Sequence, residues 1–267
     1  MFDKAYTDEF LRWACHDVAR AEEILRRHPD LIHHRTPHVG ETPLHYLAIE
    51  NKLDAVRLLI RSGADVNTAT DSGDTPLISA VMVDALAMAQ LLVEHGADVN
   101  TSSSLTGTAL HNAAGHGHLP MIRLLLDAGA NIEAMEDLDG TPLHMAVSEG
   151  HAEATRLLLD RGANIHATTC YGATVMHRIG ENATVALLEL LSARSARLNA
   201  LGNDGWSALH MAACSAPIEV IQWLLDHGLD PMQEGDDGVL RIHQAQRFNR
   251  SDVAELLERD ARRAMSG

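Results

Sequence analysis

Apolar and polar positions repeat every 33 residues along most of this chain. Each period opens with a Thr slot, often continued by Pro-Leu-His, and a pair of large apolar residues follows 16 and 17 positions later. Flanking apolar residues such as Val56 and Ile60 give the second stretch the three-to-four spacing of a helix buried along one side. The pattern therefore predicts two short helices per period. The opening slot is held by Thr42, Thr75, Thr108, Thr141, Thr174, Ser207 and Leu240.

Local signals mark where these helices begin and end. Thr is a favoured N-cap, and Pro suits the first helical position because its missing N–H has no partner there in any case. A glycine after the second helix supplies the left-handed residue that closes a helix. An extended piece and a turn around a further glycine then predict a projecting, hairpin-like loop. The closing residues are Gly63, Gly96, Gly129, Ser195, Gly162 and Gly228.

The periods are expected to form a single domain over residues 1–267. Residues 8–35 carry a degenerate copy without Thr-Pro, as an end unit that covers an open face would. Six internal repeats follow over residues 36–237, and residues 238–262 form a second cap-like unit. Apolar residues make up 46% of the chain but aromatic residues only 3%, which suits thin layers of closely stacked helices.

The combined motif resembles the ankyrin repeat family. It rests on Thr42-Pro43-Leu44-His45, Thr141-Pro142-Leu143-His144, the Gly-His pairs at 117–118 and 150–151, and Gly96-Ala97-Asp98-Val99-Asn100. The resemblance runs from about residue 8 to 262. It implies an all-α solenoid of stacked helix-turn-helix units with projecting hairpin-like loops. It also implies a concave face that binds a protein partner, without catalysis or a cofactor.

Two repeats depart from the motif. Repeat five, residues 172–182, lacks the Pro and the Ala-Ala pair, and we expect it to be the weakest internal seam. Repeat seven has Gln246 where a small apolar residue normally packs, and its Gln244 falls at a position expected to be exposed.

The variable positions of the frame predict the partner-binding residues. They lie three and one residues before the Thr slot, and four, seven and eight residues after it. Interfaces concentrate binding energy in Trp, Tyr and Arg, so three such residues on one face of consecutive units predict a hot spot. The alternative for Trp206 is packing across a neighbouring loop, and Trp223 is expected to pack in the slot of a core Leu. The predicted partner-binding residues are Tyr171, Arg178, Glu181, Trp206, Met145, Met211, Arg247 and Phe248.

Two other functions remain open at this point. An enzyme could use the irregular repeat five, with His177, Cys214, Glu181 or Arg178 as chemical groups, and it would need a closed pocket with shifted pKa values. A metal binder could use His33, His34 and His38, which lie on one turn. Ten of the 17 histidines recur at fixed positions of the repeat and predict scaffold roles. We therefore expect no catalytic residue and no metal site.

The charge of the chain narrows the class of partner. With 37 acidic and 21 basic residues the net charge is −16, which argues against nucleic acids and anionic membranes. Acidic loop tips, at Asp71, Asp74 and residues 136–139 and 234–237, would steer a partner with a basic surface, or serve solubility only.

The cysteines, the N-terminal residues and the length of the apolar runs indicate the cellular compartment. Three widely spaced cysteines predict reduced thiols. No signal peptide and no run of 18 apolar residues is visible, so we expect a cytoplasmic protein. We also expect it to be a monomer.

Overall fold

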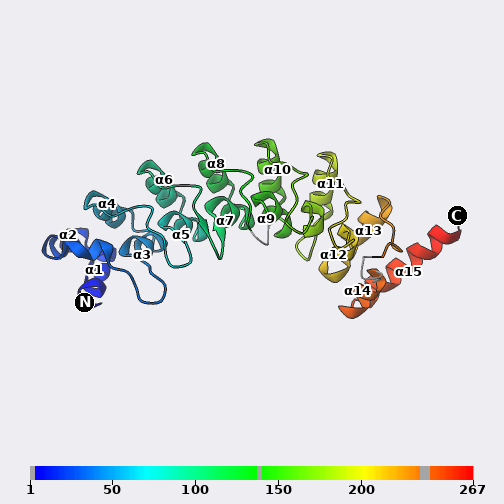
Figure 1. Cartoon of the computed structure of the whole chain (residues 1–267), viewed down its shortest axis with the longest axis horizontal. Helices are drawn as coiled ribbons and strands as arrows, with labels where there is room; N and C mark the ends of the chain where they lie inside the picture. The colour runs from blue at the N-terminus through cyan, green and yellow to red at the C-terminus, as the bar shows by residue number, and fades with distance from the viewer. Residues whose placement is uncertain (1–3, 137–139, 235–240, 267) are drawn as a thin grey trace. The chain divides into compact units, whose positions relative to one another are not determined.

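The structure is a computed structural model that describes residues 4–136, 140–234 and 241–266. Its contacts group into two compact units. The first comprises Met1–Ala113 and His118–Asn131, and the second comprises Ala114–Gly117 and Ile132–Gly267. Figure 1 labels the α-helices of both units.

The first unit alternates inner and outer helices. Helix α1 contacts α3, and α3 contacts α5, while α2, α4, α6 and α8 contact one another in succession. The elements are α1 Lys4–His16, α2 Val18–Arg27, the 3-10 helix η1 Pro29–His33, α3 Pro43–Ile49, α4 Leu53–Arg61, α5 Pro76–Met82, α6 Leu86–Glu94, β1 Ser102–Ser103, β2 Gly107–Thr108, α7 Ala109–Gly115 and α8 Leu119–Asp127.

The second unit repeats this arrangement. Its inner row runs α9, η2, α12 and α14, and its outer row runs α10, α11, α13 and α15. The elements are α9 Pro142–Ser148, α10 Ala152–Asp160, the 3-10 helix η2 Val175–Arg178, α11 Val185–Ala193, α12 Ala208–Ser215, α13 Ile218–Asp226, α14 Arg241–Arg247 and α15 Ser251–Ser266.

The predicted helix boundaries are confirmed. Thr75 is the N-cap of α5, and the backbone N–H of Ile78 donates to its hydroxyl at 3.3 Å. Gly63 and Gly162 close α4 and α10 with φ of +96° at both, and Ser195 does the same for α11 with φ of +66°. Replacing a Thr cap by Ala typically lowers helix stability by about 1 kcal/mol.

Aliphatic side chains build the core, as the low aromatic content predicts. Leu59 and Leu92 on the outer row of the first unit are 0% exposed, as are Leu158 and Leu191 in the second. Burying each such Leu contributes roughly 1.5–3 kcal/mol. The second residue of each apolar pair therefore anchors its outer helix.

The hairpin-like loops are also confirmed. Strands β1 and β2 pair antiparallel, with Ser102 opposite Thr108 and Ser103 opposite Gly107. In the second unit, Leu201 and Ser207 form an isolated antiparallel bridge of the same kind.

Repeat five corrects the expectation of two α-helices in every repeat. Its first helix is the four-residue 3-10 helix η2, which ends at Ile179 with φ −72° and ψ 109°. Ile179 and Gly180 stand where other repeats carry residues such as Ala146 and Val147, and a glycine inside a helix costs about 1 kcal/mol. The chain therefore leaves the helix early, while the Ile179 side chain stays buried.

Repeat seven reverses the expected exposure of two glutamines. Gln244 is 2% exposed, whereas Gln246 is exposed and Ala245 is buried between them. In solvent, the Gln246 amide keeps its hydrogen bonds to water. The predicted cap boundary at 237–238 lies outside the described residues.

We predict that backbone amides of residues 172–196 exchange hydrogen faster than those of residues 141–163. The reason is that a four-residue 3-10 helix has few internal hydrogen bonds and opens at low cost. Hydrogen exchange with mass spectrometry on the whole chain measures both segments in one experiment. Equal protection of the two segments would contradict the prediction.

Candidate functional site

The eight predicted partner-binding residues all belong to the second unit. Met145 lies on α9, Arg178 is the last residue of η2, Met211 lies on α12 and Arg247 is the last residue of α14. Glu181 and Phe248 follow the inner-row elements, while Tyr171 and Trp206 precede them in the loops. We call these eight residues the inner-row surface.

The structure brings the Tyr171 and Trp206 loops together. The N–H of Asn203 donates to the carbonyl of Tyr171 at 2.9 Å, and the N–H of Gly202 donates to the carbonyl of Trp206 at 2.8 Å. Tyr171 is 61% exposed. Trp206 is half-buried and stacks on the His210 ring, with ring centroids 5.7 Å apart. Tyr171 is therefore available to a partner, whereas Trp206 offers only part of its ring.

Apolar side chains continue this surface along the inner row. Phe248 is 53% exposed and Met211 is 37% exposed, and Met145 is half-buried. Exposed apolar side chains that gather on one surface are typical of interaction sites.

Charged groups interrupt the apolar positions. Arg178 is half-buried, and its positive charge acts on the neighbouring His144. Glu181 and Arg247 are exposed. The surface thus combines two guanidinium groups with one carboxylate.

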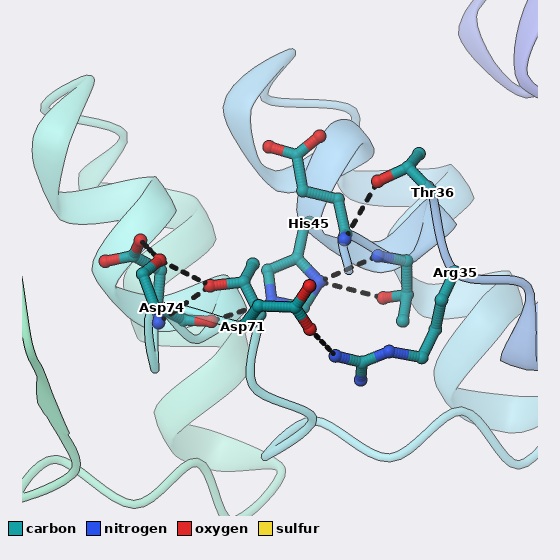
Figure 2. A network of polar contacts seen from close by, with 9 residues as sticks. Arg35, Thr36, His45, Asp71 and Asp74 are labelled. Atoms are coloured by element: carbon teal, nitrogen blue, oxygen red, sulfur yellow. Dashed lines mark hydrogen bonds and ion pairs between the residues drawn. The ribbon is translucent and has the colours of Figure 1, made fainter. Parts of the chain in front are cut away.

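Histidines hold the frame of the repeats in both units. In the first unit, the N–H of Thr42 donates to Nδ1 of His45 at 3.1 Å. Nε2–H of His45 donates to the carbonyl of Asp74 in the next loop at 3.0 Å. Figure 2 shows this arrangement, together with the ion pair of Arg35 and Asp71 at 3.3 Å. One imidazole thus joins a helix start to the neighbouring repeat.

These histidines are held in the neutral form. Burial is the main cause that lowers the pKa of His45. Burial, followed by the charge of Arg178, lowers the pKa of His144 to about 4. A protonated Nδ1 could not accept the hydrogen bond from the Thr N–H, so the cap requires the neutral ring.

Two of the four groups named by the enzyme hypothesis, His177 and Cys214, have surroundings that the structure describes. Nδ1 of His177 accepts from the N–H of Thr174 at 3.0 Å, and Nε2–H donates to the carbonyl of Trp206 at 3.0 Å. Both ring nitrogens are therefore engaged in the scaffold. Burial raises the pKa of the Cys214 thiol, against the opposing charges of Arg250 and Arg247. A thiol with a raised pKa is a poor nucleophile.

The metal hypothesis finds no ligand cluster within the described part of the chain. Over residues 4–136, 140–234 and 241–266, no group of three or more His, Cys, Asp or Glu side chains could hold a metal ion. Nδ1 of His34 lies 3.0 Å from the hydroxyl of Thr7, so this ring has a structural partner.

The acidic loop tips are partly engaged. Asp71 pairs with Arg35, and Asp74 accepts from Ser72 at 2.6 Å and from Thr106 at 3.3 Å. Residues 137–139 and 235–237 lie outside the described residues.

A groove between the outer helices α13 and α15 was not anticipated. It has a volume of about 780 Å³, and its walls include Trp223 and Leu256. Trp223 is half-buried instead of filling the core slot, and its ring stacks on His227 with centroids 3.6 Å apart. The available signal was a Trp at a position where other repeats have Leu.

Comparisons with known proteins agree with the fold. A family model described as ankyrin repeats (3 copies) matches residues 11–103, 101–169 and 176–262. The structure is similar to the crystal structure of the human ASB11 ankyrin repeat domain, with a TM-score of 0.69 and 28% sequence identity. The match covers 81% of this chain and 98% of that chain. A search of curated proteins finds no match.

None of the helices formed by the described residues is both long and apolar enough to cross a bilayer.

We predict that the free energy of unfolding falls as the pH drops from about 6.5 to about 4. His144 binds its proton near pH 6.5 in the unfolded chain but only near pH 4 in the folded one, so acid favours unfolding across this window. The full contribution of His144 to this pH dependence of the free energy of unfolding amounts to roughly 3 kcal/mol, which is present above pH 6.5 and lost toward pH 4. Urea unfolding at a series of pH values measures it.

The matched variants separate this residue from other titrating groups. His144→Ile copies the natural Ile78 of repeat two and should flatten the pH dependence, at the cost of lower stability at neutral pH. His166→Gln, which removes an exposed ring, should leave the slope unchanged. An unchanged slope in His144→Ile would refute the assignment.

Proposed function

Because the chain belongs to the ankyrin repeat family, we propose that it binds a partner protein through the inner-row surface of its second unit, without catalysis of its own. The observation that carries the proposal is the exposure of Tyr171, Met211 and Phe248 on consecutive repeats of one unit. Such bulky side chains supply much of the binding energy at protein interfaces. The buried scaffold histidines beneath them hold the surface in place before binding.

Charge defines the rest of the proposed interface. Arg178 and Arg247 would form hydrogen-bonded ion pairs with carboxylates of the partner, since guanidinium groups bind carboxylates with two parallel bonds. The net charge of −16 would steer a partner that carries a basic surface elsewhere. Binding of this kind would inhibit or regulate the partner by covering its surface.

The proposal includes the cellular compartment and the oligomeric state of the chain. Cys15, Cys170 and Cys214 form no disulfide with one another, which supports a reducing compartment such as the cytoplasm. We expect the chain to act as a monomer and as one cooperative domain. Sedimentation of the purified chain tests the monomer.

We predict that Tyr171→Ala, Met211→Ala and Phe248→Ala together weaken partner capture by about tenfold or more. All three side chains are exposed, so the triple variant should keep its fold and its thermal unfolding midpoint. The measurement is capture from a lysate of the source organism by the tagged chain, quantified by mass spectrometry. Arg178→Ala should weaken the same interaction.

The control is Met232→Ala, which removes a Met that is 45% exposed on the connection after α13. We expect some proteins to be captured by wild type and by this control but not by the triple variant. If every captured protein binds all three chains equally, the inner-row surface is not the binding site.

A further inference from the structure

We propose that the groove between α13 and α15 is a second docking site, which binds a basic amphipathic helix of a partner protein. The groove lies on the outer row of the second unit and shares none of the eight inner-row residues. Its volume of about 780 Å³ falls within the range of ligand sites, about 300–1,000 Å³. The inference is independent of the inner-row surface.

An aromatic side chain lines this groove where the repeat normally has an aliphatic one. Leu occupies the slot of Trp223 in the other six periods, and Leu58, Leu91, Leu157 and Leu190 are buried there. The Trp ring remains half-exposed and stacks on His227. Nδ1–H of His227 donates to the carbonyl of Trp223 at 2.7 Å, which fixes the stacked pair. A fixed, half-exposed Trp is a typical interface anchor.

The floor beside this Trp is apolar. Leu256 of α15 is 5% exposed, and Ile218, the first residue of α13, is 36% exposed. An apolar side chain of a partner could therefore cover Ile218 and the Trp ring together.

The charges at one end of the groove are acidic and lack ion pairs. Glu219 and Asp252 lie in the first turns of α13 and α15, and Glu255 lies one turn further along α15. All three are exposed, and none of them takes part in a salt bridge with any residue that the structure describes. They would attract Lys or Arg side chains of a partner.

The two guanidinium groups that line the groove each have a polar partner, but only that of Arg262 forms an ion pair among the described residues. Arg259 donates to Oε1 of Gln222 at 3.4 Å, while Nε2–H of Gln222 donates to Asp226 at 2.9 Å. Arg262 pairs with Glu258 at 3.6 Å. The groove is lined by the carboxylates of Glu219, Asp226, Asp252 and Glu255 and by two guanidinium groups, so its charge is acidic in balance and a basic segment complements it.

The length of the groove is sufficient for a short helix. Residues that line it recur at helical spacing on both walls, at 219, 222, 223 and 226 on α13 and at 252, 255, 256 and 259 on α15. At ~1.5 Å per residue, residues 252–262 span about 15 Å, which is the length of nearly three helical turns. An amphipathic helix that places its apolar face on Trp223 and its Lys or Arg residues near Glu219 fits this groove.

Selection from a display library of random peptides of about 16 residues, with the whole chain as target, tests the proposal. Trp223→Leu serves as the counter-target because Leu is the usual residue of this slot, so the variant should fold. The expected peptides carry bulky apolar residues at three-to-four spacing together with Lys or Arg. Trp223→Leu should weaken their binding about tenfold or more, as measured by fluorescence polarisation.

Charge variants make the test independent of the Trp replacement. Glu219→Lys with Glu255→Lys changes only exposed side chains and should abolish binding, while Glu219→Gln with Glu255→Gln should weaken it several-fold. Inner-row variants such as Met211→Ala should bind these peptides like wild type, so this test and that of the inner-row surface can fail separately.

Three results would overturn the proposal. The first is that no peptide distinguishes the wild-type chain from Trp223→Leu. The second is that the selected peptides are acidic or uncharged. The third is that the double Lys variant binds them undiminished.

Discussion

The neutral histidine at the third position of the first helix is the constraint on which most of the repeats depend. In five repeats its Nδ1 accepts the backbone N–H of the Thr or Ser that opens the helix, at 3.0–3.2 Å. At His45 and His177 the other nitrogen donates to the next loop. A helix of seven residues or fewer is not stable by itself in water. Its stability must therefore come from this histidine and from packing against the neighbouring repeats. The same bond at His177 positions Trp206, which links the scaffold to the proposed interface.

Much of the fold could be predicted because the determinants are local and recur. Thr at the helix start, glycine at the end and the paired Leu at positions 16 and 17 each act within one repeat, and the structure confirms them. Repeat five departs from the prediction because several weak effects compete there. The β-branched Ile179 and Gly180 both weaken the helix, and the chain leaves it as a four-residue 3-10 turn with the Ile179 side chain buried.

The candidate surface was harder to predict because exposure depends on neighbours that lie 33 residues away. The position of a residue in the repeat specifies which way its side chain points, but not how much of the side chain is exposed. Tyr171 and Phe248 are exposed as expected. Gln244 is buried, although Met211 is exposed at the same position of the preceding repeat. Trp206 is half-buried and stacks on His210. Trp223 shows the opposite case. It was expected in the core, but its indole is larger than the Leu of the other repeats and remains at the surface, where it forms a wall of the groove.

Local charge, more than net charge, decides which partner each surface of the second unit can accept. Coulomb interactions between exposed groups are screened within about 8–10 Å at moderate salt, so the total of −16 acts mainly on the approach of a partner. At contact distance the inner-row surface presents the guanidinium groups of Arg178 and Arg247, whereas the outer groove presents unpaired carboxylates at Glu219, Asp252 and Glu255. Two partners of opposite local charge could therefore be recognised by adjacent helices of the same repeats. The repeat frame permits this, because exposed positions on the inner and outer helices can change without altering the Leu and His residues that hold the repeats together.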